Sequence, residues 1–177
     1  AAPLASASGE DKIGELGDFA LESGVVLPAA KLSYVTHGEL KGNNTILVPS
    51  AYLGDHHGFD FLIESGLALD PEKYFIVATD MFQNGLSSSP SNTPPPFDGP
   101  NFPEISIRDN IAAGYRLLTE ELGINHIKAV IGFSMGAQQA FQWTVSHPDF
   151  MDKAIGIVDD SCREKICFPM LGACGIT

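Results

Sequence analysis

The most constraining feature of the sequence is the pentapeptide Gly-Phe-Ser-Met-Gly at positions 132–136, which stands between two clear structural patterns. It follows the apolar run 128–131, which predicts a buried strand, and it opens the pattern 135–146, which predicts a helix ended by Pro148. A Gly-x-Ser-x-Gly string often arises by chance. Between a strand and a helix, however, its sharp turn exposes the serine hydroxyl at the edge of a sheet.

Further apolar runs predict the rest of that sheet. A hairpin is expected over 19–26, and strands are expected over 31–36, 45–48, 74–79 and 153–158. Helical patterns separate the later runs, and such alternation is typical of parallel strands joined by crossover helices. We therefore predict an α/β domain with a mostly parallel sheet and flanking helices.

Three helices can be predicted together with the side chains that they bury. One begins after Ser106, which forms a capping box with Asp109, and ends at Gly123. Apolar residues at helical spacing give its buried stripe: Ile111, Tyr115, Leu118 and Leu122. The expected stripe of the helix over 135–146 is Ala137, Ala140, Phe141 and Thr144. A third helix is expected over 59–69, from Phe59, Leu62, Ile63 and Leu67.

The segment Asn84–Pro103 is unlike the rest of the chain, because it holds six of the 12 prolines. Such a segment cannot form regular structure. Long loops in compact domains are usually functional. Since strand patterns continue on both sides, we expect this segment to form a wall or rim over a site.

Composition narrows the classes of partner. The 177 residues are 44% apolar and 18% charged, which is typical of one globular domain. Asp and Glu number 22 against 10 Lys and Arg, a net charge of −12. This balance repels phosphate backbones and anionic lipids, so neither nucleic acid nor a membrane is an expected partner.

The cysteines and histidines predict no metal site. All three cysteines fall near the end of the chain, at Cys162, Cys167 and Cys174, and their spacing matches no zinc or redox template. No other group of His, Cys or carboxylate residues has metal-ligand spacing. The compartment is left open between the cytoplasm and secretion.

Ser134 is the candidate nucleophile, because the turn holds its hydroxyl at a helix N-terminus, where developing negative charge is favoured. The backbone N–H of Met135 is the first candidate donor to an oxyanion. The second should come from the loop 49–54, where we favour the N–H of Tyr52 over that of Leu53. The alternatives are that Ser134 is only a helix N-cap and that 49–54 is an ordinary strand-to-helix turn.

Several segments, taken together and in this order, resemble the homoserine O-acetyltransferases and their α/β-hydrolase relatives. The segments are 19–24, 32–40, 84–90, 107–109, 132–136, 142–143 and 147–148. The resemblance implies an α/β-hydrolase fold and acyl transfer through an acyl-serine at Ser134, with Met135 and Tyr52 as oxyanion donors. It implies a small-molecule substrate and no bound cofactor, with acetyl-CoA as an acyl donor or with hydrolysis of esters or amides. It also suggests substrate contacts for Arg108 and Asp109, although capping explains Asp109 equally well.

The sequence departs from this family after the nucleophile. In that family the acid and the histidine base of the catalytic triad follow the serine far downstream. Here the only histidine after Ser134 is His147, at the opposite end of the following helix. From Asp159 onward the resemblance stops. We therefore expect a flexible segment over 1–16, a partial hydrolase core over 17–158 that lacks the lid and last strands, and a divergent tail over 159–177.

Two open questions follow from this departure. His56 and His57 lie in the loop on the oxyanion side, so a rebuilt triad of Ser134, His57 and Asp159 is one alternative, and a solvated histidine pair is the other. The protein is then either an acyl-transfer enzyme or a catalytically silent binding or dimerising protein. The open edge of the strand 153–158 predicts a homo-oligomer or a complex with a missing C-terminal partner chain.

Overall fold

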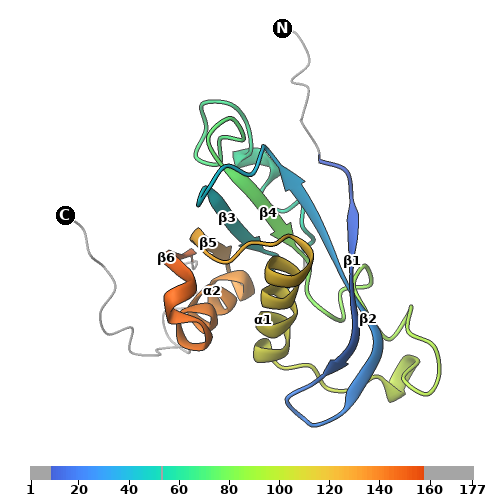
Figure 1. Ribbon diagram of the computed structural model, residues 1–177. Helices are drawn as coiled ribbons and strands as arrows, with labels where there is room; N and C mark the ends of the chain where they lie inside the picture. The colour runs from blue at the N-terminus through green and yellow to red at the C-terminus, as the bar shows by residue number, and fades with distance from the viewer. Residues whose placement is uncertain (1–8, 53, 158–177) are drawn as a thin grey trace, which may run out of the picture.

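The computed structural model describes residues 9–52 and 54–157, which form one six-stranded sheet with two α-helices (Figure 1). The strands are β1 (Lys12–Ala20), β2 (Val26–His37), β3 (Thr45–Pro49), β4 (Phe75–Thr79), β5 (Ile127–Phe133) and β6 (Met151–Ile157). The helices are α1 (Ile107–Arg116) and α2 (Met135–Ser146), with short helical turns at Asp60–Leu62, Gly99–Asn101, Leu117–Glu121 and Pro148–Phe150. Within these ranges no helix is long and apolar enough to cross a membrane.

The strand order β1-β2-β4-β3-β5-β6 confirms the predicted α/β class. Strands β4, β3, β5 and β6 run parallel to one another. Strands β1 and β2 form an antiparallel hairpin, and β2 pairs antiparallel with β4. The chain passes from β4 to β5 through α1 and from β5 to β6 through α2, as the alternating pattern predicted. The parallel strands therefore direct their carboxyl ends to one edge of the sheet.

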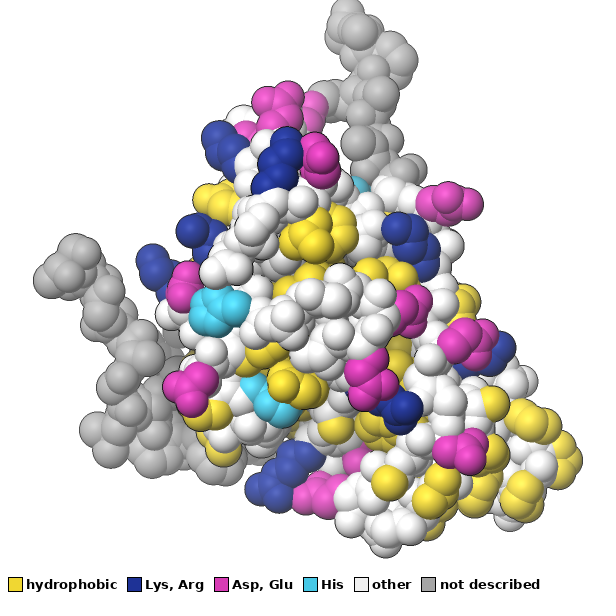
Figure 2. All heavy atoms as spheres, in the orientation of Figure 1, with side chains coloured by type: hydrophobic (Ala, Val, Ile, Leu, Met, Phe, Trp, Pro, Cys, Tyr) yellow, Lys and Arg dark blue, Asp and Glu magenta, His cyan; other side chains and the backbone are white. Residues whose placement is uncertain are grey.

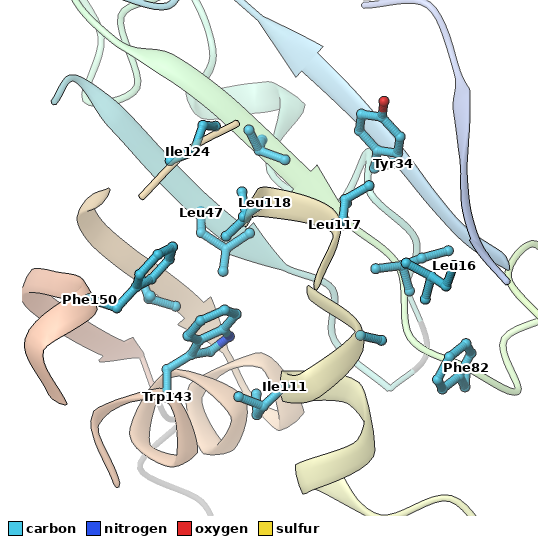
Figure 3. Close-up of a cluster of buried hydrophobic side chains, with 14 of the residues drawn as sticks. Leu16, Tyr34, Leu47, Phe82, Ile111, Leu117, Leu118, Ile124, Trp143 and Phe150 are labelled. Atoms are coloured by element: carbon cyan, nitrogen blue, oxygen red, sulfur yellow. The ribbon is translucent and has the colours of Figure 1, made fainter. Parts of the chain in front are cut away.

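Alternate residues of the central strands face two separate cores. Leu47, Val77 and Val130 point to the face covered by the helices, where they join a large cluster with Ile111 and Trp143 (Figure 3). Their strand neighbours point to the opposite face and pack against the chain around residues 59–69: Ile46, Val48, Ile76 and Ala78. Each large apolar side chain buried in this way contributes about 1.5–3 kcal/mol.

The helix predicted over 59–69 is not formed. Only the turn Asp60–Leu62 is helical, and Gly66 adopts a φ of 85°, which a right-handed helix cannot accommodate. Phe59 and Ile63 are buried nonetheless, because the turns of this segment press them against the sheet. Of the other two residues of the predicted stripe, Leu62 is half-buried and Leu67 is exposed. The helical spacing therefore found two buried residues but assigned them the wrong local structure.

Two smaller expectations also need correction. Helix α2 has the predicted bounds, but it buries Trp143 and leaves Thr144 exposed, because the buried face is centred one residue earlier than the predicted stripe. Strand β1 begins at Lys12 and buries Leu16, so residues 12–16 belong to the sheet rather than to a flexible leading segment. The tail 159–177 lies outside the described residues.

The segment between β4 and α1 is irregular, as predicted, but hydrogen bonds join it to β2. The Ser87 hydroxyl accepts the backbone N–H of Ser33 at 3.0 Å, and the Ser88 hydroxyl accepts that of Lys31 at 2.9 Å. Both serines are buried. The segment is therefore fixed along β2 by bonds that serve in place of a strand ladder.

Helix α1 begins with the predicted capping box, which also ties it to the β1–β2 hairpin. The Ser106 hydroxyl accepts the N–H of Asp109 at 3.1 Å, and Oδ2 of Asp109 accepts the N–H of Ser106 at 2.8 Å. Oδ1 of Asp109 accepts the N–H of Glu22 at 2.7 Å. One buried carboxylate thus satisfies donors from two distant segments.

We predict that Asp109→Asn lowers the free energy of unfolding by about 1–3 kcal/mol, measured by urea denaturation. The amide group would face backbone donors with an N–H₂, which leaves a buried donor without an acceptor. Asp98→Asn is the matched control, because Asp98 is exposed and caps nothing with its side chain. Equal unfolding midpoints for the two variants would show that the carboxylate does not secure the hairpin.

Candidate functional site

Ser134 occupies a one-residue turn between β5, which ends at Phe133, and α2, which begins at Met135. Its backbone has a φ of 53° and a ψ of −117°, a conformation that costs a residue with a side chain about 1–3 kcal/mol. The N–H of Ser134 donates to the carbonyl oxygen of Ile157 at 3.0 Å, which anchors the turn to the neighbouring strand β6. The side chain of Ser134 is exposed at the carboxyl end of β5.

The two glycines of the turn are required by close packing. A Cβ atom on Gly132 would overlap the carbonyl oxygen of Gly136. A Cβ atom on Gly136 would lie 2.6 Å from the carbonyl oxygen of Pro49, at the end of β3. The glycines therefore let the first turn of α2 cross both β5 and β3 at close range.

This crossing places the N-terminus of α2 beside the loop that follows β3. The buried side chain of Gln139 donates to the carbonyl oxygen of Ser50 at 3.0 Å. The first N–H groups of a helix have no acceptor within the helix and carry partial positive charge. The loop and the free N–H groups of α2 therefore border the same space.

That space is a cavity of about 960 Å³ at the carboxyl ends of the strands. The loops after β3 and β4, the approach to α1 and the start of α2 form its walls, and both Tyr52 and Met135 line it. Asn84 and Leu86 also line it, so the start of the proline-rich segment borders the cavity. In open α/β sheets this edge is where ligands bind. Leu53, the other candidate donor, lies outside the described residues.

His57 has carboxylate partners on both ring nitrogens. Nδ1 lies 2.8 Å from Oδ2 of Asp60, and Nε2 lies 3.1 Å from Oδ1 of Asp11. Burial lowers the pKa of His57, but Asp60 and Asp11 outweigh it and raise the pKa overall. Both ring nitrogens of His57 are therefore engaged by carboxylates, and no hydrogen bond joins His57 to Ser134 in the described ranges. Asp159, the third member of the rebuilt triad, lies outside those ranges.

His56 is buried rather than solvated, which corrects the alternative of a solvated pair. Its Nδ1 lies 2.7 Å from Oδ2 of Asp80, and its Nε2 lies 3.1 Å from Oδ1 of Asp11. Burial lowers the pKa of His56, but hydrogen bonds to Asp80 and Asp11 and their negative charges raise it to about 9. The two histidine rings are 4.4 Å apart between centroids.

Asp11, Asp60 and Asp80 were missed by the sequence analysis. Asp11 precedes β1 and is 45 residues from His56 along the chain, so no spacing rule connects them. The sequence supported no metal site. The fold nevertheless brings Asp11, His56 and His57 together, with one potential ligand atom from each within 4.8 Å of the others.

The other candidate side chains serve the packing of the helices. His147 ends α2 and stacks on Tyr115, with ring centroids 3.9 Å apart and an angle of 4° between the planes. Arg108 pairs with Glu22 at 2.7 Å, and Asp109 is committed to the capping box. Each of the three therefore has a structural partner, and the substrate contacts suggested for Arg108 and Asp109 stay a prediction.

Comparisons with known proteins agree with this geometry. Residues 44–163 match the family model described as the alpha/beta hydrolase fold. The chain is 42% identical over 145 residues to an ethyl acetate hydrolase of Pseudomonas veronii, which covers 80% of this chain and 42% of that protein. It is 39% identical over 172 residues to a homoserine O-acetyltransferase of Methanosalsum zhilinae, covering 85% of this chain and 35% of that protein.

The fold is also similar to that of a solved structure. An acetylester hydrolase from Corynebacterium glutamicum superimposes with a TM-score of 0.79 and 40% identity, over 82% of this chain and 43% of that one. The chain thus spans less than half the length of these relatives. The family model covers more than half of the chain, and the relatives confirm the resemblance to homoserine O-acetyltransferases. The chain therefore belongs to the α/β-hydrolase family.

Proposed function

We propose that this chain carries the nucleophile half of an acyl-transfer site, in which the Ser134 hydroxyl attacks the carbonyl carbon of an ester. The carbonyl π bond opens to an oxyanion as the hydroxyl gives up its proton. Collapse of the oxyanion re-forms the carbonyl and breaks the bond to the alkoxide, which takes a proton and leaves as the alcohol, so that an acyl-serine remains. Transfer of the acyl group to water or to a hydroxyl then restores the serine. The backbone conformation of Ser134 carries this proposal, because the fold holds a strained, exposed serine directly before Met135, which begins α2 and lines the cavity.

The oxyanion would be held by the N–H groups of Met135 and Tyr52. Both residues line the cavity, and the close contact between Gly136 and Pro49 brings their two segments together. A pair of such donors acts most strongly where negative charge develops in the transition state. Removing one donor from a site of this kind typically costs about 10²–10³ in kcat.

The lining of the cavity favours a small uncharged ester. Among its described lining residues there is no Lys or Arg, and Asp55 adds a negative charge. The histidine that lines it, His57, already has a carboxylate partner on each ring nitrogen. The phosphates of acetyl-CoA and the carboxylate of an amino acid would both seek a cationic partner. Similarity to an ethyl acetate hydrolase and an acetylester hydrolase supports the same choice. We therefore favour hydrolysis of a small acetyl ester over O-acetyl transfer from acetyl-CoA.

A second candidate function is a catalytically silent binding or dimerising protein. One observation favours it: within residues 9–52 and 54–157, no histidine is hydrogen-bonded to Ser134. Without a general base, an oxyanion hole and binding alone give about 10³–10⁴-fold acceleration over water. The two functions therefore differ in whether the Ser134 hydroxyl is activated.

We predict that a fluorophosphonate probe labels the full chain at Ser134, because phosphorus bonds to the activated oxygen as fluoride leaves. Intact mass spectrometry should show one adduct in the wild type and none in Ser134→Ala. Ser146→Ala is the matched control, since Ser146 is exposed at the other end of α2 and should not affect labelling.

Absence of the adduct in a folded wild-type sample would contradict the catalytic proposal and favour the silent protein. Labelling that persists in Ser134→Ala would assign the reactive hydroxyl to another residue. Far-ultraviolet circular dichroism of each sample establishes that the chain is folded.

The outer edge of β6 supports a proposal of self-association or of pairing with a missing C-terminal partner. In the described part of the chain β6 pairs with β5 alone, and Ile155 and Ile157 are 44% and 43% exposed. An apolar strand with an open ladder tends to pair with another chain.

We predict that light scattering gives a mass above the 18.9 kDa of one chain, and that Ile155→Lys shifts the mass toward that value. A lysine on an edge strand opposes strand pairing through its charge and hydration. Thr144→Lys, on the exposed face of α2, is the control for added charge alone. A monodisperse wild-type monomer would contradict this proposal.

A further inference from the structure

Asp11, His56 and His57 form a compact group next to the cavity, and they come from two segments far apart in the sequence. Asp11 lies just before β1, and the histidines lie in the loop after β3. We propose that these three side chains bind a divalent transition-metal ion of the Zn²⁺ class, through Nε2 of each histidine and a carboxylate oxygen of Asp11.

The distances between these atoms suit shared ligation of one ion. Oδ1 of Asp11 lies 3.1 Å from Nε2 of His56 and 3.1 Å from Nε2 of His57. Two ligands each ~2.0–2.1 Å from a zinc ion lie about 2.9 Å apart at a right angle and about 3.4 Å apart at a tetrahedral angle. The observed separations fall between these limits. Asp11 can adjust to the ion, because its side chain is 68% exposed.

The opposite nitrogen of each ring is already held as in metal sites. Nδ1 of His56 is 2.7 Å from Oδ2 of Asp80, and Nδ1 of His57 is 2.8 Å from Oδ2 of Asp60. A carboxylate on Nδ1 accepts that N–H, which directs the other nitrogen toward a common point and makes it a better ligand. An ordinary structural ion pair involves one carboxylate. Here each ring has its own carboxylate on Nδ1, and Asp11 lies between the two Nε2 atoms.

The charge of the cluster also favours a cation. Three carboxylates surround two rings, and one oxygen of Asp80 and one of Asp60 are buried without a hydrogen-bond partner. The Asp80 side chain is fully buried, so its charge is poorly screened by solvent. A divalent ion would place two positive charges among these carboxylates, at a point that Nε2 of each ring already faces.

The ligand types indicate which ions are expected. Imidazole nitrogens suit zinc, copper, iron and nickel, whereas magnesium and calcium prefer sites made of oxygen ligands. Two nitrogens and one carboxylate oxygen leave at least one position for water or for another ligand. His57 lines the cavity, in the same loop as Tyr52. The ion would therefore brace this loop against the start of β1.

The test is titration of the chelator-treated full chain with Zn²⁺ by isothermal calorimetry, and with Co²⁺ by visible absorption. The expected result is one ion per chain, with affinity at least about tenfold weaker in Asp11→Asn and in His57→Gln. The cobalt spectrum should lack a thiolate charge-transfer band, which separates this site from binding by cysteines. His126→Gln is the matched control, because His126 also meets a carboxylate, Asp152, at 2.9 Å but has no second histidine ligand.

Asp60→Asn tests the orienting carboxylate without removing a ligand, and it should weaken binding by about 10–100-fold. Circular dichroism of each variant establishes folding, and exposed Asp11 offers the substitution least disturbing to the core. The proposal is overturned if the wild type binds no ion in stoichiometric amount, or if Asp11→Asn and His57→Gln bind it as the wild type does. A thiolate band in the cobalt spectrum would equally contradict it.

Discussion

The close crossing of α2 over the ends of β5 and β3 is the constraint on which the rest of the site depends. Gly136 allows the helix to approach the carbonyl oxygen of Pro49, where any side chain would collide. Gly132 removes the corresponding obstacle on the other side of Ser134. The serine is held in its unfavourable backbone conformation because strand, helix and neighbouring loop are all fixed around it. The same crossing places Met135 and Tyr52 on one cavity.

The fold around this crossing could be predicted largely from local signals. The apolar strands, the capping box of α1 and the turn at 132–136 are each determined by residues close together in the sequence. The structure confirms all three. The predictions that were wrong concern features that depend on packing between residues far apart in the sequence. Residues 59–69 have helical spacing, but packing on the sheet and the conformation of Gly66 prevail. The buried face of α2 is set by its neighbours α1 and β5 rather than by its own apolar residues alone.

The candidate site was predictable to a similar degree. The position of Ser134 follows from a contiguous motif, so it could be found without the fold. The carboxylates around His56 and His57 could not be found in this way, because they come from three separate places in the chain: just before β1, just after β4 and the turn at 60–62. Charge offers no guide either, since the net charge of −12 is spread widely; acidic and basic side chains are interspersed on the face shown in Figure 2.

The central claim is that Ser134 accepts an acyl group, and acetylation of the chain by a small activated ester tests it most directly. The folded protein would be mixed with p-nitrophenyl acetate, quenched in acid within seconds and mapped by peptide mass spectrometry, with Ser134→Ala treated in parallel. The account predicts an acetyl group on the peptide that contains Ser134, formed faster than on any lysine or tyrosine. Acetylation spread equally over surface residues, with none at Ser134, would contradict it.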